Sequence, residues 1–469
     1  MADDELASLA ATKRQQILPY GRVVNFAPGP ACLPVEVLLE AQQDFLNWRG
    51  CGMSILEMSH RGRYYLKMLE ETKGHLAALL NLPPSHHLLF MQGGATLQFA
   101  AQPLNMLRAS GDTADYVITG NWSRYAFKEA GKYGNMRVAA DNKANGSVDL
   151  PAVTEWSLNP NAAYVHYCDN ETVYGLEFPQ TPDLSQARFL PPTELPLFSS
   201  SSPSSPGPGD AGANGSAEGS NGNGGEKSPA EYSAKTKLRL TSDMSSNFCS
   251  RPIDIEAHAL IVAGAQKNVG PSGVTIVIAR DDVLGKELDL CPSMCSYSLC
   301  KKADSALNTP PVFSIYIVGL MAKYLRKQGG LASWADVCAR KAKKIYDVID
   351  ESDVFLCPVA EGARSRMNIR FSVVDPSHRE EHEAREGATK TAREQAPEHV
   401  ELTRKFLREA EERGLYHLEG HRALGGCRAS LYTGMPMEGV DALVQFMKEF
   451  AEENSDVSSP ETKKSRQAA

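Results

Sequence analysis

The chain of 469 residues lacks a long hydrophobic run: no window approaches the roughly 18 apolar residues of a membrane span. It also lacks a basic excess, because 49 Lys and Arg stand against 57 Asp and Glu, and no dense basic tract precedes the polar C-terminal tail. The opening MADDELASLAATKRQQ does not show a charged stretch followed by an apolar one, which is the order in a secretory signal peptide. We therefore expect a soluble, cytoplasmic protein that binds neither membrane nor nucleic acid.

The ten cysteines lack the density and spacing of a disulfide framework. The only cluster, Cys291, Cys295 and Cys300, has neither paired CxxC spacing nor a nearby histidine. We predict no metal site and reduced, structural thiols. Cys249 and Cys427 lie nearer the chemistry described below, and the sequence leaves their sensitivity to oxidation open.

Ser, Gly, Pro and Asn dominate one internal segment, about 183–236, which includes SSSSPSSPGPGDAGANGSAEGSNGNGGEKSPAEY. Such a composition buries too little apolar surface to offset its ordering entropy, so we predict a disordered insertion in a loop. A second, charged insertion is expected at about 376–396. We expect an N-terminal arm (1–23), a large domain (24–335), a small C-terminal domain (336–452) and a disordered tail (453–469).

Strand-like and helix-like patterns alternate through the rest of the chain. Expected strands include 87–93, 114–120, 258–266 and 273–280, and expected helices include 35–48, 96–107 and 125–134. This alternation predicts an α/β domain with a mainly parallel sheet. The apolar runs HALIVAGAQ and GVTIVIAR have the continuous Val/Ile pattern of parallel strands buried on both faces. The last third predicts a smaller α/β unit, which leaves a cleft between two domains for a ligand.

Lys267 follows one of these buried runs, among the small residues of IVAGAQKNVGPSG. A lone lysine at a strand end more often turns outward and buries only its stem. Asp243 also ends an apolar strand, and taken alone it is more often a helix cap. A third strand ends in Gly93, Gly94 and Ala95 immediately before a helix, an arrangement that suits a phosphate.

Two further predicted strands end in polar or aromatic side chains, with Trp122 after one and Asn170, Glu171 and Thr172 after the other. Ligands of open α/β sheets bind beyond the carboxyl ends of the strands, so we expect all these groups at one edge. An amine, a carboxylate, an anion site and a flat aromatic face are what pyridoxal 5′-phosphate requires. We therefore predict this cofactor, with Lys267 pointing toward it.

Ten motifs, in order, closely resemble the phosphoserine aminotransferase family: NFAPGPACLP, SHRG, GGATLQFAAQPLN, ADYVITGNW, HYCDNET, SRPIDI, GAQKNVGPSGVTIVI, NTPPVFSIY, RSRMNI and GHRALGGCRASLY. That family belongs to the class-V group of fold-type I pyridoxal-phosphate enzymes. The resemblance runs from about Val24 to Phe450, apart from the two insertions. It implies a seven-stranded, mainly parallel sheet, a smaller C-terminal domain and a homodimer whose active sites are shared.

The resemblance also implies roles for single residues. Lys267 would form the Schiff base with the cofactor and then move a proton, while Asp243 would face the pyridine nitrogen. Trp122 would stack on the ring and Thr172 would bond its hydroxyl. The cofactor phosphate would be held by Ala95, Thr96 and Gln266, joined by Asn308 and Thr309 of the second subunit. The chain departs from the family's pattern at two places. It reads APGP where many relatives carry a serine, and Ala95-Thr96 where some relatives carry an arginine.

Cationic residues govern the expected substrate. Any one arginine can simply be surface charge, but Arg428 lies between apolar residues, where a buried guanidinium requires a fixed anion. The resemblance assigns Arg428 to the α-carboxylate. It assigns the substrate phosphate to His421 and Arg422, with His60 and Arg61 from the other subunit. The implied reaction is transamination between L-glutamate and 3-phosphohydroxypyruvate, which yields O-phospho-L-serine and 2-oxoglutarate in serine biosynthesis.

Three alternatives stay open at this point. A serine–glyoxylate aminotransferase has no use for so many cations at the substrate end. A cysteine desulfurase needs a nucleophilic cysteine on a mobile loop, and no cysteine here lies in a recognisable loop motif. A non-catalytic cofactor-binding scaffold would not require Lys267, Asp243 and Arg428 together.

Overall fold

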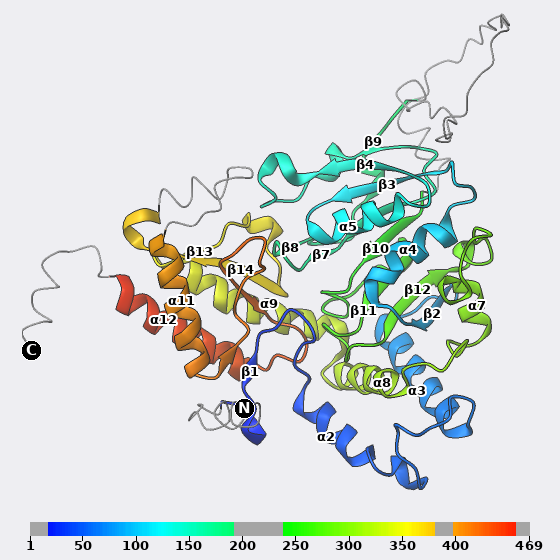
Figure 1. Cartoon of the computed structure of the whole chain (residues 1–469), viewed down its shortest axis with the longest axis horizontal. Coiled ribbons are helices and arrows are strands. Elements are labelled where there is room, and N and C mark those ends of the chain that lie inside the picture. The colour runs from blue at the N-terminus through cyan, green and yellow to red at the C-terminus, as the bar shows by residue number, and fades with distance from the viewer. Residues whose placement is uncertain (1–16, 192–237, 380–396, 456–469) are drawn as a thin grey trace, which may run out of the picture.

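The computed structural model describes residues 17–191, 238–379 and 397–455 (Figure 1). Its α-helices are α2 (Val35–Asp44), α3 (Arg63–Leu80), α4 (Gly94–Met106), α5 (Asn121–Ala130), α7 (Tyr297–Lys302), α8 (Val312–Lys327), α9 (Gly330–Asp350), α11 (Pro397–Glu412) and α12 (Met437–Ser455). None of these described helices is both long and apolar enough to cross a membrane.

A seven-stranded sheet forms the centre of the larger part of the molecule. Its order is β2-β12-β11-β10-β6-β3-β4, with β2 (His86–Met91), β3 (Thr113–Ile118), β4 (Asn135–Asp141), β6 (Val165–Cys168), β10 (Leu240–Asp243), β11 (His258–Gly264) and β12 (Thr275–Arg280). All strands except β12 run in one direction. The prediction of an α/β fold with a mainly parallel sheet is confirmed.

The prediction that both strands flanking Lys267 are parallel is wrong for one of them. β12 pairs antiparallel with β11, with Ile261 opposite Ile278. Only ten residues separate Gly264 from Thr275, whereas a parallel return needs a crossover of about a dozen residues or more. Both strands are nevertheless buried on both faces, so their apolar pattern could not reveal the direction.

Helices cover both faces of this sheet, and alternate residues of β11 show how. Ile261 and Ala263 pack into a core with α3 and α8. Leu260 and Val262 point the other way, into a core with α4, α5 and α7. Figure 1 shows these helices on either side of the central strands. Burial on both faces fixes the sheet rigidly and brings its strand ends to one edge.

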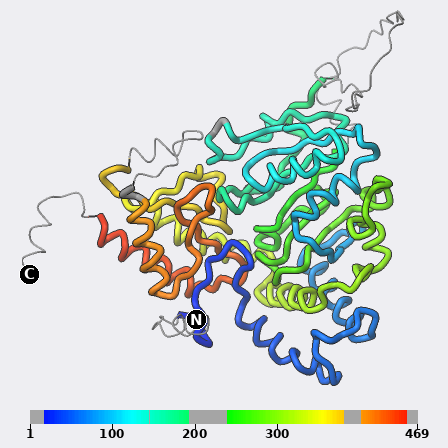
Figure 2. Tube along the Cα trace, viewed as in Figure 1, coloured from blue at the N-terminus to red at the C-terminus, as the bar shows by residue number. Residues whose placement is uncertain are grey.

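A smaller antiparallel sheet, β13-β14-β16, forms the second unit, with β13 (Phe355–Leu356), β14 (Asn368–Val373) and β16 (Cys427–Ser430). A separate core joins it to α9, α11 and α12. The N-terminal strand β1 (Val24–Asn25) also packs here, parallel to β15 (Leu415–Tyr416). Figure 2 shows this early segment, in blue, running beside the late part of the chain.

The expected boundaries need several corrections. Residues 183–191 are not disordered: a 3-10 turn spans Leu184–Gln186, and β9 (Arg188–Phe189) pairs with β5 (Ser157–Leu158). The rest of the predicted insertion, 192–236, lies outside the described residues. Pro376–His378 form a 3-10 turn, residues 380–396 are not described, and α12 runs to Ser455 inside the expected tail. Helix α9 runs through the expected domain boundary at 335–336.

Candidate active site

The predicted functional groups meet at the carboxyl edge of the seven-stranded sheet. Asp243 is the last residue of β10, and Lys267 follows β11 by three positions. Thr172 follows the short strand β7 (Asn170–Glu171) after β6, and Trp122 lies in the first turn of α5 after β3. Parallel direction of these strands brings the four side chains from different parts of the sequence to one place.

Lys267 does not turn outward, because its side chain is only 9 % exposed. Its Nζ donates a hydrogen bond to Oγ1 of Thr172 at 2.7 Å and lies 5.4 Å from the centre of the Trp122 ring. Burial lowers the pKa of Lys267, and the nearby carboxylates of Asp243 and Glu171 oppose that shift. The amine is therefore positioned to lose its proton more readily than an exposed lysine.

Asp243 is held by the segment that follows it. Its Oδ1 accepts hydrogen bonds from the backbone N–H of Ser245 at 2.9 Å and from the Ser245 hydroxyl at 2.6 Å. Ser245 Oγ in turn accepts from the N–H of Gly264, at the end of β11. Since both bonds fall on Oδ1, the Oδ2 atom has no hydrogen-bonding partner among the described residues and can receive a donor from a ligand.

Glu171 supports the segment that carries Trp122, although sequence reasoning gave it no individual role. Its carboxylate accepts from the N–H groups of Trp122 and Ser123, at 3.1 and 2.9 Å, and from the Ser123 hydroxyl at 2.7 Å. It thereby caps α5 and fixes the backbone that carries Trp122. Burial raises the pKa of Glu171. The sequence offered one signal of this contact, the glycine at position 120. In the structure, a Cβ atom there would lie 2.7 Å from the Glu171 carboxyl carbon.

The glycine turn before α4 offers backbone donors. Gly93 has φ 86° and forms the N-cap without a side-chain cap, and a Cβ there would come within 2.6 Å of Leu97. The first N–H groups of α4, including those of Ala95 and Thr96, have no intrahelical acceptor and point toward the helix start. Such a terminus favours a phosphate.

The other residues predicted to contact the cofactor phosphate differ in burial and in distance along the chain from Lys267. Gln266 is half-buried, next to Lys267. Asn308 and Thr309 are exposed. Within their own chain they lie at the end of β2, where Gln92 Nε2 donates to Asn308 Oδ1 at 3.0 Å and to the Thr309 carbonyl at 3.5 Å.

Arg428, in β16, brings the smaller unit to the site. It is 6 % exposed, and its Nη1 donates a hydrogen bond to the Thr172 carbonyl at 3.4 Å. Its buried Nε has no hydrogen-bonding partner, and no carboxylate of the described residues forms an ion pair with it. Burial lowers the pKa of Arg428. An unpaired buried guanidinium is a strong indication of an anionic ligand.

Two more basic residues, His421 and Arg422, precede β16, and His421 lies near Arg428. Burial lowers the pKa of His421, and the charges of Arg428 and Arg422 lower it further. Arg422 itself is exposed. His60 and Arg61 belong to the segment before α3, and no described contact joins them to the other site residues of their own chain. The structure therefore brings together Lys267, Asp243, Trp122, Thr172 and Arg428, with His421 near Arg428. Among the described residues, no contact joins Arg422, His60 or Arg61 to this group.

The residues present fit pyridoxal phosphate. A buried amine, a carboxylate with a free oxygen, an aromatic ring beside that amine and a helix start with free N–H groups are the complementary donor set. Among the described residues, no group of three or more His, Cys, Asp or Glu side chains could hold a metal ion. Cys249 and Cys427 are fully buried, and burial raises the pKa of both thiols.

Asn268 anchors the segment that carries Lys267. Its Nδ2 donates to the Ser246 carbonyl at 2.9 Å, and its Oδ1 accepts from the Thr433 N–H at 3.0 Å. Ser246 follows β10, while Thr433 follows β16 in the smaller unit. The turn after Lys267 is therefore fixed to both parts of the molecule.

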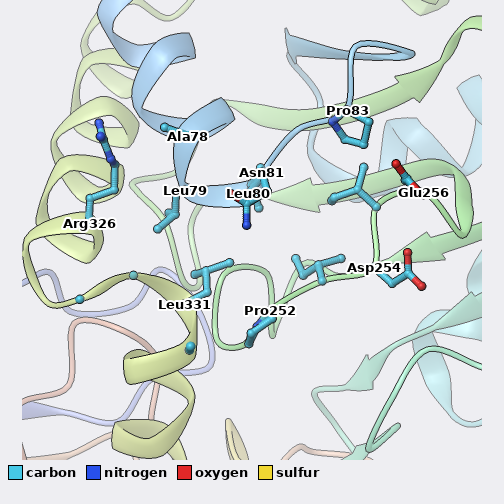
Figure 3. A pocket seen from close by; sticks show the side chains of 15 residues that line it. Ala78, Leu79, Leu80, Asn81, Pro83, Pro252, Asp254, Glu256, Arg326 and Leu331 are labelled. Carbon is cyan, nitrogen blue, oxygen red and sulfur yellow. The ribbon is translucent and has the colours of Figure 1, made fainter.

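A cavity of about 680 Å³ lies apart from these groups (Figure 3). It is formed by the end of α3, the segment 252–256 and the junction of α8 with α9, with Asp254, Glu256 and Arg326 as its charged residues. None of the predicted site residues lines it. Figure 3 shows the Asp254 and Glu256 carboxylates at one side and Arg326 at the other.

Comparison with known proteins gives consistent matches. The family model for class-V aminotransferases matches residues 23–188 and 229–443. A phosphoserine aminotransferase of Nitrosomonas europaea is 40% identical over 430 residues, 92% of this chain and 98% of the relative. Phosphoserine aminotransferase 2, chloroplastic, of Arabidopsis thaliana is also 40% identical, over 92% of this chain and 84% of the relative.

Solved structures agree. The phosphoserine aminotransferase from Bacillus circulans subsp. alkalophilus superposes with a TM-score of 0.74 and 37% identity, over 92% of this chain and 99% of that one. The pyridoxal-phosphate-bound phosphoserine aminotransferase from Trichomonas vaginalis gives 0.73 and 34% identity, over 91% and 100%. The gap in the family match, 189–228, coincides with the Ser/Gly/Pro-rich segment.

Proposed function

The chain belongs to the phosphoserine aminotransferase family of class-V aminotransferases, and from that membership we propose its reaction. It is a pyridoxal-phosphate-dependent transaminase that converts 3-phosphohydroxypyruvate and L-glutamate into O-phospho-L-serine and 2-oxoglutarate, in L-serine biosynthesis. The observation that carries the proposal is that Thr172 bonds both the Lys267 amine and the Arg428 guanidinium, which has no carboxylate partner among the described residues. An amine for the cofactor and a cation for a substrate carboxylate thus meet at one residue.

Pyridoxal phosphate, when bound, condenses with an amine and draws electrons away from the carbon attached to that nitrogen. We assign the N–H groups of Ala95 and Thr96, with Gln266, to its phosphate. Asp243 Oδ2 would accept from the ring nitrogen and keep it protonated, Trp122 would stack on the ring, and Thr172 would bond its hydroxyl. The hydrogen bonds from Ser245 hold the Asp243 carboxylate still for that contact.

We assign two roles to Lys267: it would hold the cofactor, and its amine would carry a proton to and from the substrate Cα. A general base works best when its pKa is close to the working pH. Burial lowers the pKa of Lys267 in that direction. The hydrogen bond to Thr172 orients Nζ beside the Trp122 ring, so the neutral amine stays within the site.

Substrate recognition would rest on the cations. Arg428 would bind the α-carboxylate through the Nε and Nη atoms that lack carboxylate partners. His421 and Arg422 would bind the phosphate of phosphoserine or the γ-carboxylate of glutamate. A glyoxylate-specific site would leave these charges without a partner, which favours the phosphorylated substrate. One test is an amino-acceptor screen: phosphohydroxypyruvate should exceed glyoxylate, pyruvate and oxaloacetate in kcat/KM, and a preference for glyoxylate would contradict the proposal.

We further propose a cytoplasmic homodimer in which the partner contributes His60, Arg61, Asn308 and Thr309 to each site. The isolation of His60 and Arg61 from the rest of the site within one chain supports this arrangement. Mixed dimers of Lys267→Ala and Arg61→Ala chains provide the test. Random pairing should restore about a quarter of wild-type activity, because each mixed dimer contains one native site. If Arg61 served its own chain, mixing would restore none.

A further inference from the structure

A second cavity, of about 490 Å³, lies where the N-terminal segment, the start of α2, Tyr324 of α8, one face of α9 and residues 433–438 meet. None of the residues assigned to the active site lines it. Much of its wall is apolar, with Leu33, Val35, Val337, Met435 and Met437. Such a volume is in the usual range of small-molecule sites.

Lys341 lines this cavity from α9 and is 2 % exposed. No hydrogen bond or ion pair joins its Nζ to any described residue; Nζ lies 5.1 Å from the centre of the Trp334 ring, and the carboxylate of the exposed Glu438 acts on its charge from a longer distance. Burial lowers the pKa of Lys341. A buried ammonium without an acceptor is unfavourable by itself, so its presence calls for a compensating anion.

Trp334 gives an independent observation in the same cavity. Its Nε1 is buried and has no hydrogen-bonding partner among the described residues. An indole N–H is a donor only, so it also requires an acceptor. Lys341 and Trp334, which both line this cavity, therefore each carry a donor without a hydrogen-bonding partner among the described residues.

The remaining charges define which acceptor fits. Arg22 is half-buried, and its Nη2 donates a hydrogen bond to the Leu33 carbonyl. Glu36 and Glu438 also line the cavity, and both are exposed. These two acids would repel an anion of high charge such as phosphate, while a single carboxylate could pass them and reach the buried donors.

We propose that this cavity binds a small monocarboxylate with an apolar body, whose carboxylate accepts from Lys341 Nζ and Trp334 Nε1 and whose body packs against the apolar wall. This site is separate from the active site and does not depend on the proposed reaction. Its ligand class follows from two unsatisfied donors, an apolar wall and acids confined to exposed positions.

In the test, phenylacetate is the probe, and isothermal titration calorimetry measures its binding to the full-length holoenzyme. We expect one additional phenylacetate per chain, at least tenfold weaker binding of the uncharged 2-phenylethanol, and no competition by inorganic phosphate. Lys341→Met should weaken phenylacetate binding at least tenfold. Lys343→Met is the matched control, because Lys343 lies on the same helix but is exposed and pairs with Asp347, and it should leave binding unchanged.

Trp334→Phe keeps an aromatic ring but removes the N–H, and should weaken phenylacetate binding several-fold. It remains informative if the Lys341 variant fails to fold. The cofactor absorbance of each variant, compared with wild type, reports folding independently of the new site. Absence of phenylacetate binding to the holoenzyme, or unchanged affinity in the Lys341 variant, would overturn the proposal.

Discussion

The Nζ atom of Lys267 lies 2.7 Å from Oγ1 of Thr172, although the two residues are 95 positions apart in the chain. One follows β11 and the other follows β6 and β7, on strands separated in the sheet by β10. Asp243 ends that middle strand. The sheet therefore places the amine, the hydroxyl and the carboxylate side by side, and each prediction below depends on this arrangement or on what supports it.

The lowered pKa of Lys267 predicts how the apo-protein takes up its cofactor. The neutral amine is the reactive form, so attachment of pyridoxal phosphate should accelerate as pH rises and level off below pH 10.5, the ordinary lysine value. Asp243→Asn removes the main charge that raises this pKa, so its profile should move to lower pH. Stopped-flow absorbance measures both rates. The free cofactor titrates identically in both series, so coincident profiles would contradict the coupling.

Glu171 predicts a structural effect on Trp122. Glu171→Gln replaces one acceptor oxygen with an NH₂ group that faces existing donors, so one buried donor of α5 loses its partner. We expect destabilisation of about 1–3 kcal/mol and a shift in the tryptophan emission. Glu155→Gln is the control, because Glu155 bonds only the exposed Ala152 N–H and should change stability little. Equal effects of both variants in urea unfolding would refute the assigned role.

Arg428 and Arg422 should differ in what they recognise. Arg428→Lys removes the paired geometry from a buried site, so kcat/KM should fall about 100-fold or more for glutamate and phosphoserine alike. Arg422→Gln should raise KM for phosphoserine more than for glutamate, since the phosphate carries more charge. Half-reactions with each amino acid, monitored by cofactor absorbance, separate these effects. A loss confined to phosphoserine in the Arg428 variant would mean that the two roles are exchanged.

The ion pair between Glu177 and Arg366 should contribute to the stability of the contact between the two units. Arg366 donates to the buried Glu177 carboxylate through Nη2 at 2.7 Å, Nε at 3.1 Å and its backbone N–H at 2.8 Å. Arg366→Met leaves that carboxylate without its principal partner and should cost about 3 kcal/mol. Arg404→Met breaks the exposed pair with Glu401 and should cost about 0.5 kcal/mol or less. Similar urea midpoints for both variants would contradict this prediction.

Much of the site could be predicted from local sequence because each residue follows a recognisable apolar strand. Lys267, Asp243, Trp122 and Thr172 lie at strand ends, and a parallel sheet necessarily gathers such positions at one edge. Strand direction could not be predicted equally well. β12 is as apolar as its neighbours, and only the short connection from Gly264 shows that it must return antiparallel.

Other features depend on contacts between distant residues. The start of α5 at Asn121, earlier than expected, follows from the cap that Glu171 provides from another strand. The ordering of residues 188–189 follows from pairing with β5, about 30 residues earlier in the chain. Neither partner is visible within a local window, so local composition assigned that segment to a disordered insertion.

The central claim is that Lys267 is the amine that holds the cofactor. Borohydride reduction of the yellow holoenzyme should fix the cofactor permanently to that amine, and peptide mapping then locates it. Lys267→Ala should lose transaminase activity, while the exposed Lys343→Ala serves as a control and retains it. The account predicts a single label on the peptide that contains Lys267. A label on another lysine, or none in fully loaded protein, would contradict it.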